Sequence, residues 1–239
     1  MTSLSGAIIA AGRGERLRNT TGGVPKPLVK VGSETLLIRQ IKAMLALGVR
    51  PVHVIVNEET AQLMAEYRIS VPPAVDLVVR DTPSSMESLL VLGERIEPGR
   101  FLLATVDAVL RLDEFGSFVE RACELTAPNR PAQWDGALGV VKWRGDRHPL
   151  FAEVAADGQI SGLNGRASES VTAGVYVFST RIFDHAAAAR TRELSAMRHF
   201  LALLIEAGMR FAAVRLKGVI DVDEGADLAA ARAMLAEDR

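Results

Sequence analysis

A short apolar run near the start of the chain leads directly into a glycine-rich turn. Residues 7–11 are all apolar, and Gly12 and Gly14 follow at once. A run of this length predicts a buried β-strand, and glycine lets the backbone after it adopt positive φ and approach a ligand closely. Free N–H groups in such a turn form a concave site for an anion. We therefore expect a phosphate-binding turn, with backbone angles at Gly12 that a β-branched residue cannot adopt.

Two cations follow this turn at short range and would face an anion bound there. Arg16 lies two positions after the second glycine, and Lys26 lies between two prolines. The segment is not a Walker loop, because Lys26 does not follow a glycine, nor a dinucleotide fingerprint, because Leu17 occupies the third glycine position. For the glycine pair alone, a plain turn with surface cations is an alternative. The full spacing G-x-G-x-R followed by P-K-P is more specific and favours a nucleotide.

Composition is typical of a compact globular protein. The chain has 239 residues, 49% of them hydrophobic and 24% charged, with a net charge of −1. This balance gives no support for electrostatic binding to nucleic acid or to an anionic membrane. Cys123 is the single cysteine, which excludes an internal disulfide, and the N-terminal apolar run is too short for a signal or a spanning helix. We expect a cytoplasmic protein.

Strand-like and helix-like segments alternate along the chain, which implies right-handed crossovers and a mostly parallel sheet covered by helices. A loop signal at 129–131 precedes strands that we expect to extend the sheet. The expected strands are 7–11, 52–56, 74–79, 101–106, 136–141, 150–155, 173–178 and 211–216. The expected helices are 34–47, 58–67, 84–92, 112–125, 193–206 and 224–236.

Several motifs together resemble those of the nucleotidyltransferases that activate sugar phosphates and related phospho-compounds, a superfamily that includes the molybdenum-cofactor nucleotidyltransferases. The first motif comprises Gly6–Leu17 with Pro25–Leu28. Phe101–Asp107 resembles the strand that delivers a metal-binding Asp, and Ala173–Phe178 resembles the strand beside the acceptor pocket. Val219–Asp223, followed by Asp227 and Leu228, resembles the C-terminal acidic element.

The resemblance implies a GT-A-like nucleotide-diphospho-sugar transferase fold: a single three-layer α/β domain over 1–239, with helices on both faces of a mixed, mostly parallel sheet. It also implies a nucleotide-binding half at about 1–130 and an acceptor-binding half at about 131–239. The implied reaction transfers a nucleoside monophosphate from an NTP to a phosphorylated small molecule and releases pyrophosphate. A homodimer is possible, and no nucleic-acid or membrane partner is implied.

The resemblance also assigns roles to individual residues. The catalytic cations would be Arg16 and Lys26. The nucleotide would contact Ala10, Ala11, Gly12, Gly14, Ser84 and Ser85. Mg²⁺, or Mn²⁺ in its place, would be held by Asp107 together with Asp221, Asp223 or both. The acceptor would contact Thr172, Gly174 and Lys142.

Structural alternatives accompany several of these roles. Asp107 could be a helix cap or turn residue, Asp223 could cap the helix from Glu224, and Ser84 could cap the helix that it begins. Lys142, with Arg144 and Arg147, could form a solvated edge instead of gripping an acceptor phosphate.

The base stays undecided among those of CTP, UTP, GTP and dTTP, and the acceptor stays undecided between a sugar 1-phosphate and a phospho-alcohol. Other functions also stay open: a molybdopterin-type nucleotidyltransferase, a GT-A glycosyltransferase, or a nucleotide sensor without catalysis.

Overall fold

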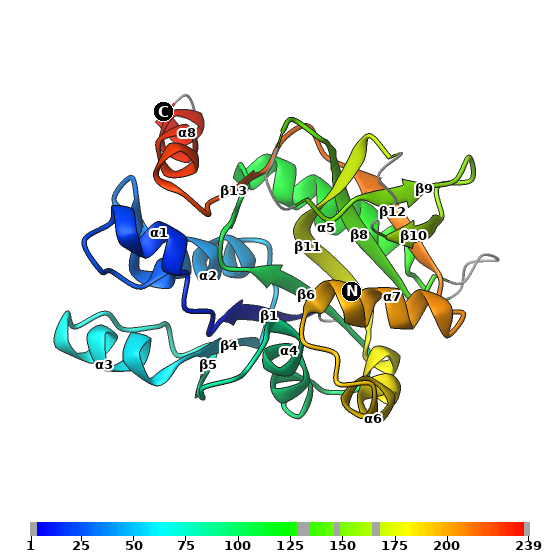
Figure 1. Cartoon of the computed structure of the whole chain (residues 1–239), viewed down its shortest axis with the longest axis horizontal. Helices are drawn as coiled ribbons and strands as arrows, with labels where there is room; N and C mark the ends of the chain where they lie inside the picture. Colours follow the sequence, from blue (N-terminus) through cyan, green and yellow to red (C-terminus); the bar gives the residue numbers. More distant parts are fainter. Residues whose placement is uncertain (1–3, 129–133, 146–148, 164–167, 237–239) are drawn as a thin grey trace.

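A seven-stranded sheet forms the centre of the computed structural model (Figure 1), which describes residues 4–128, 134–145, 149–163 and 168–236. The strand order is β12-β8-β11-β6-β1-β4-β5. Only β11, among the strands of this sheet, runs antiparallel to its neighbours. The strands are β1 (Ser5–Ala10), β4 (Val52–Val56), β5 (Val75–Val79), β6 (Arg100–Thr105), β8 (Gly136–Lys142), β11 (Ser170–Ser179) and β12 (Phe211–Arg215).

Helices cover both faces of this sheet, so the expected three-layer α/β fold is confirmed. Successive strand residues point to opposite faces. Ile8 and Leu102 accordingly pack in one buried cluster, while Ala7 and Leu103 pack in another. The first cluster includes residues of α2 (Leu36–Ala46), α3 (Glu58–Glu66), α5 (Leu112–Leu125) and α8 (Gly225–Ala236). The second includes residues of α4 (Ser85–Gly93), α6 (Ala186–Thr191) and α7 (Met197–Glu206).

The remaining elements are short, and most had no counterpart in the expected list. Three two-stranded sheets pair β2 (Lys30–Val31) with β3 (Glu34–Thr35), β7 (Ala108–Val109) with β13 (Ile220–Asp221), and β9 (Ala152–Val154) with β10 (Ile160–Leu163). The short helices are α1 (Glu15–Thr20), η1 (Lys26–Leu28) and η2 (Thr180–His185).

Two expectations after residue 130 need correction. The segment 150–155 extends the main sheet only at its start, where Phe151 bridges Val171 of β11 and the Leu150 carbonyl accepts the Thr172 N–H (2.9 Å). Its β9 part pairs with β10 in a separate hairpin, across a turn at Asp157 and Gly158. The helix expected over 193–206 begins only at Met197, because Glu193 adopts a left-handed φ of 51° that ends the preceding helix. The loop predicted at 129–131 lies outside the described residues.

The carboxyl ends of β1, β4 and β6 meet at one edge of the sheet, because these three strands are parallel and in register. The chain passes from β1 to β4 and β5 on one side, and then returns to place β6 on the other side of β1. Ligands in open α/β sheets bind at such a reversal of strand order. Within the described residues, no helix is both long and apolar enough to span a bilayer.

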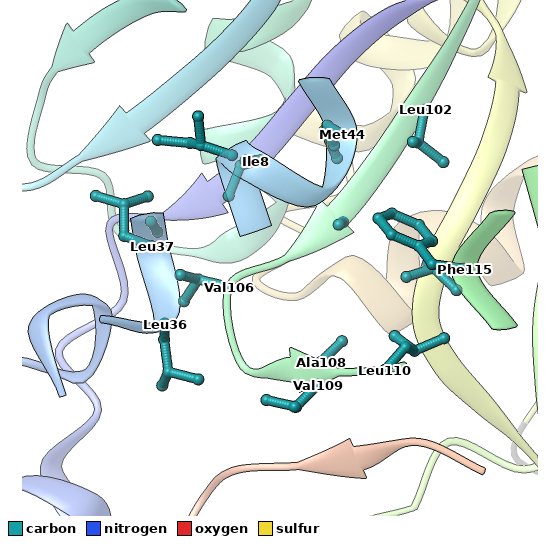
Figure 2. Packing of buried hydrophobic residues seen from close by; sticks show 14 of the residues in the cluster. Ile8, Leu36, Leu37, Met44, Leu102, Val106, Ala108, Val109, Leu110 and Phe115 are labelled. Carbon is teal, nitrogen blue, oxygen red and sulfur yellow. The ribbon is translucent and has the colours of Figure 1, made fainter. Parts of the chain in front are cut away.

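The packing of α2 against the sheet gives a direct test of this core. Leu37 is fully buried in the first cluster (Figure 2), whereas Leu112 is 48% exposed. We expect Leu37→Ala to lower the free energy of unfolding by about 2–5 kcal/mol, because the lost contacts leave a cavity. The matched change Leu112→Ala should stay within about 0.5 kcal/mol. Urea unfolding measures both, and equal effects would contradict the assigned packing.

Candidate active site

The glycine-rich turn connects β1 to α1, and its two glycines differ in conformation. Gly14 has φ 59° and begins α1, whereas Gly12 does not adopt a positive φ. The expectation that backbone angles exclude a side chain at Gly12 is therefore wrong, because that constraint falls on Gly14. A Cβ at Gly12 would meet no atom within 4 Å. Neither the backbone nor a neighbouring protein atom therefore requires glycine at this position, and the space that a ligand would need is the remaining reason for it.

Asn57 ties the turn to the next strand. It follows β4, its side-chain oxygen accepts the Thr60 N–H at the start of α3 (2.8 Å), and its Nδ2 donates to the Ala11 carbonyl (3.2 Å). The sequence analysis did not single out Asn57. A cap residue directly after a strand that neighbours β1 is the signal that could have identified it.

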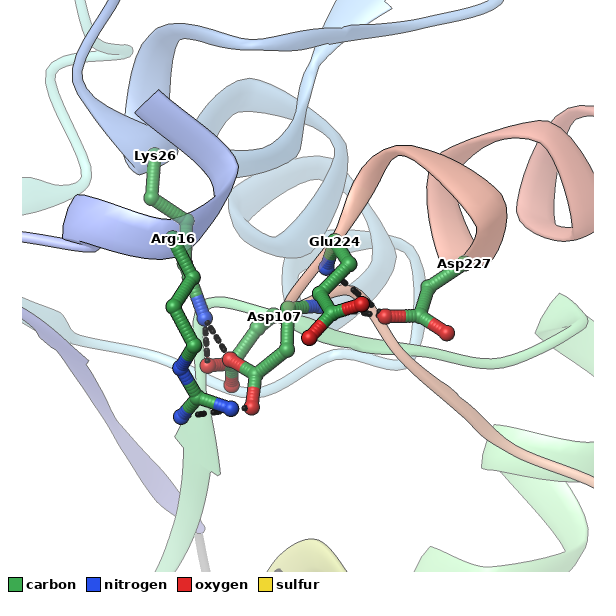
Figure 3. A network of polar contacts seen from close by, with 6 residues as sticks. Arg16, Lys26, Asp107, Glu224 and Asp227 are labelled. Atoms are coloured by element: carbon green, nitrogen blue, oxygen red, sulfur yellow. Dashed lines mark hydrogen bonds and ion pairs between the residues drawn. The ribbon is translucent and has the colours of Figure 1, made fainter. Parts of the chain in front are cut away.

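Lys26 lies in η1 between two prolines, and its side chain reaches back beneath the turn. A Cβ added to Gly14 would lie 2.6 Å from the Lys26 Cβ, so this close approach also requires glycine. The Lys26 Nζ donates to Asp107 Oδ2 at 2.7 Å and to Asp223 Oδ1 at 2.6 Å (Figure 3). Arg16 approaches the other oxygen of Asp223 at 3.2 Å. The two predicted cations thus meet two of the three predicted carboxylates.

Backbone contacts bring the acidic residues together. Asp107 follows β6, and its carbonyl accepts the Val222 N–H (3.1 Å), next to the pairing of β7 with β13. Oxygen atoms of Asp107, Asp221 and Asp223 lie within 4.8 Å of one another. The sequence placed all three residues at strand ends but could not show that the ends meet.

The structure decides against two capping alternatives. Asp107 precedes no helix directly, since α5 begins at Leu112 after Arg111, but it does lie in the turn between β6 and β7, as the turn alternative for this residue predicted. At the start of α8, Asp227 accepts the N–H groups of Asp223 (3.0 Å) and Glu224 (2.7 Å), and Figure 3 shows it on the far side of this turn from Asp107. The Asp223 carboxylate is therefore directed at the cations instead of capping the helix.

Charge pairing outweighs burial at this cluster. Burial opposes the charged form of Lys26, but the nearby carboxylates of Asp107 and Asp223 raise its pKa further than burial lowers it. Burial likewise raises the pKa of Asp107, and the ammonium of Lys26 with the hydroxyl of Thr105 lowers it below the ordinary value. Lys26 and Asp107 are therefore a pair of charged partners at neutral pH.

A cavity of about 640 Å³ opens above this cluster. Its wall combines the turn from Ala10 to Arg16 with Lys26, Asp107, Asp223 and the segment Asp81–Ser85. Ser84 caps α4, because its hydroxyl accepts the Glu87 N–H (3.1 Å), as the capping alternative predicted. The Ser85 hydroxyl accepts the Met197 N–H at 3.2 Å. Both serines nevertheless line the cavity, so capping and ligand contact are compatible.

The three predicted acceptor residues lie outside this cavity wall. Gly174 is adjacent to it, because a Cβ there, at φ 68°, would lie 2.6 Å from the Thr105 hydroxyl, which lines the cavity. Thr172 hydrogen-bonds the buried Tyr176, whose pKa burial raises to about 12. Lys142 is exposed and pairs with Glu169 at 3.6 Å. Arg147 lies outside the described residues.

The chain is similar in sequence to known proteins. Residues 6–207 match the family described as the MobA-like NTP transferase domain. This chain belongs to that family. A mannose-1-phosphate guanyltransferase of Gibberella zeae is 27% identical to this NTP transferase domain over 190 residues, covering 76% of this chain and 51% of the relative. A bifunctional IPC transferase and DIPP synthase of Archaeoglobus fulgidus is 30% identical over 201 residues, covering 80% of this chain and 36% of the relative.

Solved structures share the whole fold of this NTP transferase domain. The inositol-1-phosphate CTP transferase from T. maritima superposes with a TM-score of 0.80 at 18% identity, over 99% of this chain and 96% of the other. A UDP-glucose pyrophosphorylase gives a TM-score of 0.75 at 12% identity, over 100% of both chains. These similarities confirm the GT-A-like fold. The chain spans about half or less of the length of the curated relatives described above.

The two glycines of the turn offer a matched pair of substitutions. Gly14→Ala forces a left-handed φ on a residue with a Cβ and a clash with the Lys26 stem. We expect it to lower the free energy of unfolding by at least about 1–2 kcal/mol. Gly12→Ala should change it by no more than about 1 kcal/mol, because the added methyl group meets open space. Denaturant titration of both variants measures this difference, and a larger loss at Gly12 would contradict the backbone assignment.

Proposed function

We propose that this protein transfers a nucleoside monophosphate from an NTP to a phosphorylated small molecule, a sugar 1-phosphate or a phospho-alcohol, and releases pyrophosphate. One observation carries the proposal: Lys26 and Arg16 meet Asp107 and Asp223 in the wall of a cavity whose other wall is a glycine-rich turn. The names of the relatives, which include a guanyltransferase and a CTP transferase, support this class of reaction.

The nucleotide phosphates would lie along the turn formed by Ala10, Ala11, Gly12 and Gly14. Asn57 fixes the Ala11 carbonyl, so the turn is supported before a ligand arrives. The base and ribose would extend toward Ser84 and Ser85 on the opposite cavity wall. A cavity of about 640 Å³ falls in the size range of small-molecule sites.

The reaction joins two anions, so charge stabilisation is the main requirement. An oxygen of the acceptor phosphate attacks the α-phosphorus in line, and the bond to the bridging oxygen of the departing pyrophosphate breaks. The attacking phosphate is already ionised, so no protein base has to remove a proton. Arg16 and Lys26 would bind the phosphate oxygens on which negative charge builds up, which stabilises the transition state. The planar guanidinium of Arg16 suits two oxygens at once, and Lys26 supplies a compact charge.

The acidic cluster fits a divalent cation that prefers oxygen ligands. Carboxylate oxygens of Asp107, Asp221 and Asp223 come within 4.8 Å of one another, and all are of the ligand type that Mg²⁺ and Mn²⁺ accept. We assign these residues to hold Mg²⁺, with Mn²⁺ as a substitute. Bound there, the cation would supply positive charge next to the phosphates.

The acceptor would approach from the half of the chain at 131–239. Gly174 supports this direction, since it packs closely against Thr105, which lines the cavity, and so brings this half of the chain to the cavity rim. We assign the acceptor contacts to Thr172, Gly174 and Lys142. A phosphate drawn to this rim would face the α-phosphorus from the side opposite the turn.

A pyrophosphate-release assay tests the function. CTP, UTP, GTP and dTTP are each combined with a panel of sugar 1-phosphates and phospho-alcohols in the presence of Mg²⁺. We expect one pair to release pyrophosphate and form the nucleotide-linked product. Asp107→Asn should lower kcat of that pair by on the order of 10²-fold, since charge stabilisation is weakened.

The control is Asp113→Asn, a change at an exposed carboxylate at the start of α5, which should leave kcat unchanged. Release of a nucleoside diphosphate would instead indicate a glycosyltransferase. Full turnover by Asp107→Asn would contradict the assigned site.

A further inference from the structure

Lys26 stands in the same place as the cation that the acidic cluster would hold. Its ammonium contacts Asp107 Oδ2 and Asp223 Oδ1 at 2.7 and 2.6 Å, and these are two of the three residues assigned to the metal. Its side chain is only 10% exposed, so most of it is buried among its neighbours. An ammonium that bridges two carboxylates in this way fills the role of a small inorganic cation.

The charges of the cluster show why both cations cannot be held there together. Three carboxylates carry three negative charges, and Lys26 and Arg16 add two positive charges. A divalent cation added to this arrangement would share Asp107 and Asp223 with an ammonium and would be repelled by it at short range. With the ammonium moved away, Arg16 and one divalent cation would together balance the three negative charges.

The surroundings of Lys26 permit such a movement. Its backbone is fixed between two prolines in η1, while its four-carbon stem is flexible and its side chain lines the cavity. Nucleotide phosphates lying along the turn from Gly12 to Gly14 would offer the ammonium new anionic partners in the same cavity.

We propose that Lys26 is the resident cation of this cluster in the nucleotide-free protein, and that a divalent cation occupies Asp107 and Asp223 only when the phosphates of a nucleotide draw Lys26 away. The proposal rests on the proposed function, because it requires a nucleotide in this cavity. It adds an order to the binding events: free protein holds the divalent cation weakly, and nucleotide and cation enter together.

Titration of Mn²⁺ into nucleotide-free protein, followed by electron paramagnetic resonance, tests the proposal without any turnover. We expect weak binding to wild type and at least about 10-fold tighter binding to Lys26→Met, which retains the stem and removes the charge. Lys26→Arg should bind as weakly as wild type, because a cation is kept. Lys42→Met is the matched control, since Lys42 is 61% exposed and pairs with Glu34 instead.

Thermal unfolding gives a second readout that also reports whether the variants fold. In the presence of chelator, Lys26→Met should melt below wild type, because its carboxylates lack their partner. Added Mn²⁺ should raise the Tm of Lys26→Met more than that of wild type, since only the variant binds the ion tightly. Adding Asp107→Asn to Lys26→Met should abolish the tight site and so locate it at the cluster.

Equal or weaker Mn²⁺ binding by Lys26→Met, or no binding by either protein, would overturn the proposal. These outcomes are distinguishable from failure of the proposed function. If no acceptor and NTP pair releases pyrophosphate but Lys26→Met binds Mn²⁺ tightly, Lys26 is still the resident cation and the transfer reaction is wrong.

Discussion

Carboxylates gathered at one edge of a sheet repel one another, and the site depends on the cation that joins them. Lys26 lies 81 positions from Asp107 and 197 positions from Asp223 along the chain, yet its ammonium contacts both. The contact fixes three segments against one another: the stretch after the glycine-rich turn, the end of β6, and the turn before α8. The cavity above it has a charged floor because these three segments meet.

Strand register and hydrogen bonds to the backbone position these three segments. The parallel register of β1 with β6 places Ile9 beside Thr105, so the turn and the acidic strand end leave the sheet at the same level. The Val222 N–H bonds the Asp107 carbonyl, and Asp227 holds the start of α8. Further away, Glu87 pairs with Arg190 at 2.7 Å, which ties the serine-bearing wall of the cavity to the later half of the chain. Both proposed substrates would therefore be positioned by one connected framework.

Local patterns in the sequence predicted local structure well. The strand Val52–Val56 and the helix Leu112–Leu125 have the predicted bounds, because a short, mostly apolar run and a regular helical spacing each favour one conformation. The start of α7 was missed because the left-handed backbone at Glu193 leaves no signal in residue type. Likewise, a glycine pair does not reveal which member needs positive φ, and the structure assigns this to Gly14.

Contacts between segments that are distant along the chain could not be predicted from the sequence alone. The residue types of Arg16, Lys26 and Asp107 pointed to phosphate and metal chemistry, and their resemblance to a family gave them roles. That Lys26 bridges two carboxylates follows only from three-dimensional packing, because both lie far from it in sequence. The acceptor residues were the hardest part of the site to predict from the sequence. Lys142 and Thr172 each contact another side chain, and neither lines the cavity.

Anomalous diffraction tests the central claim most directly, using crystals grown with a non-hydrolysable NTP analogue and Mn²⁺. We expect the nucleotide phosphates to lie along the turn from Gly12 to Gly14, with the manganese peak at coordination distance from the Asp107 carboxylate. The Lys26 ammonium should then contact phosphate oxygens. A nucleotide bound elsewhere, or a manganese peak away from Asp107 and Asp223, would contradict the account.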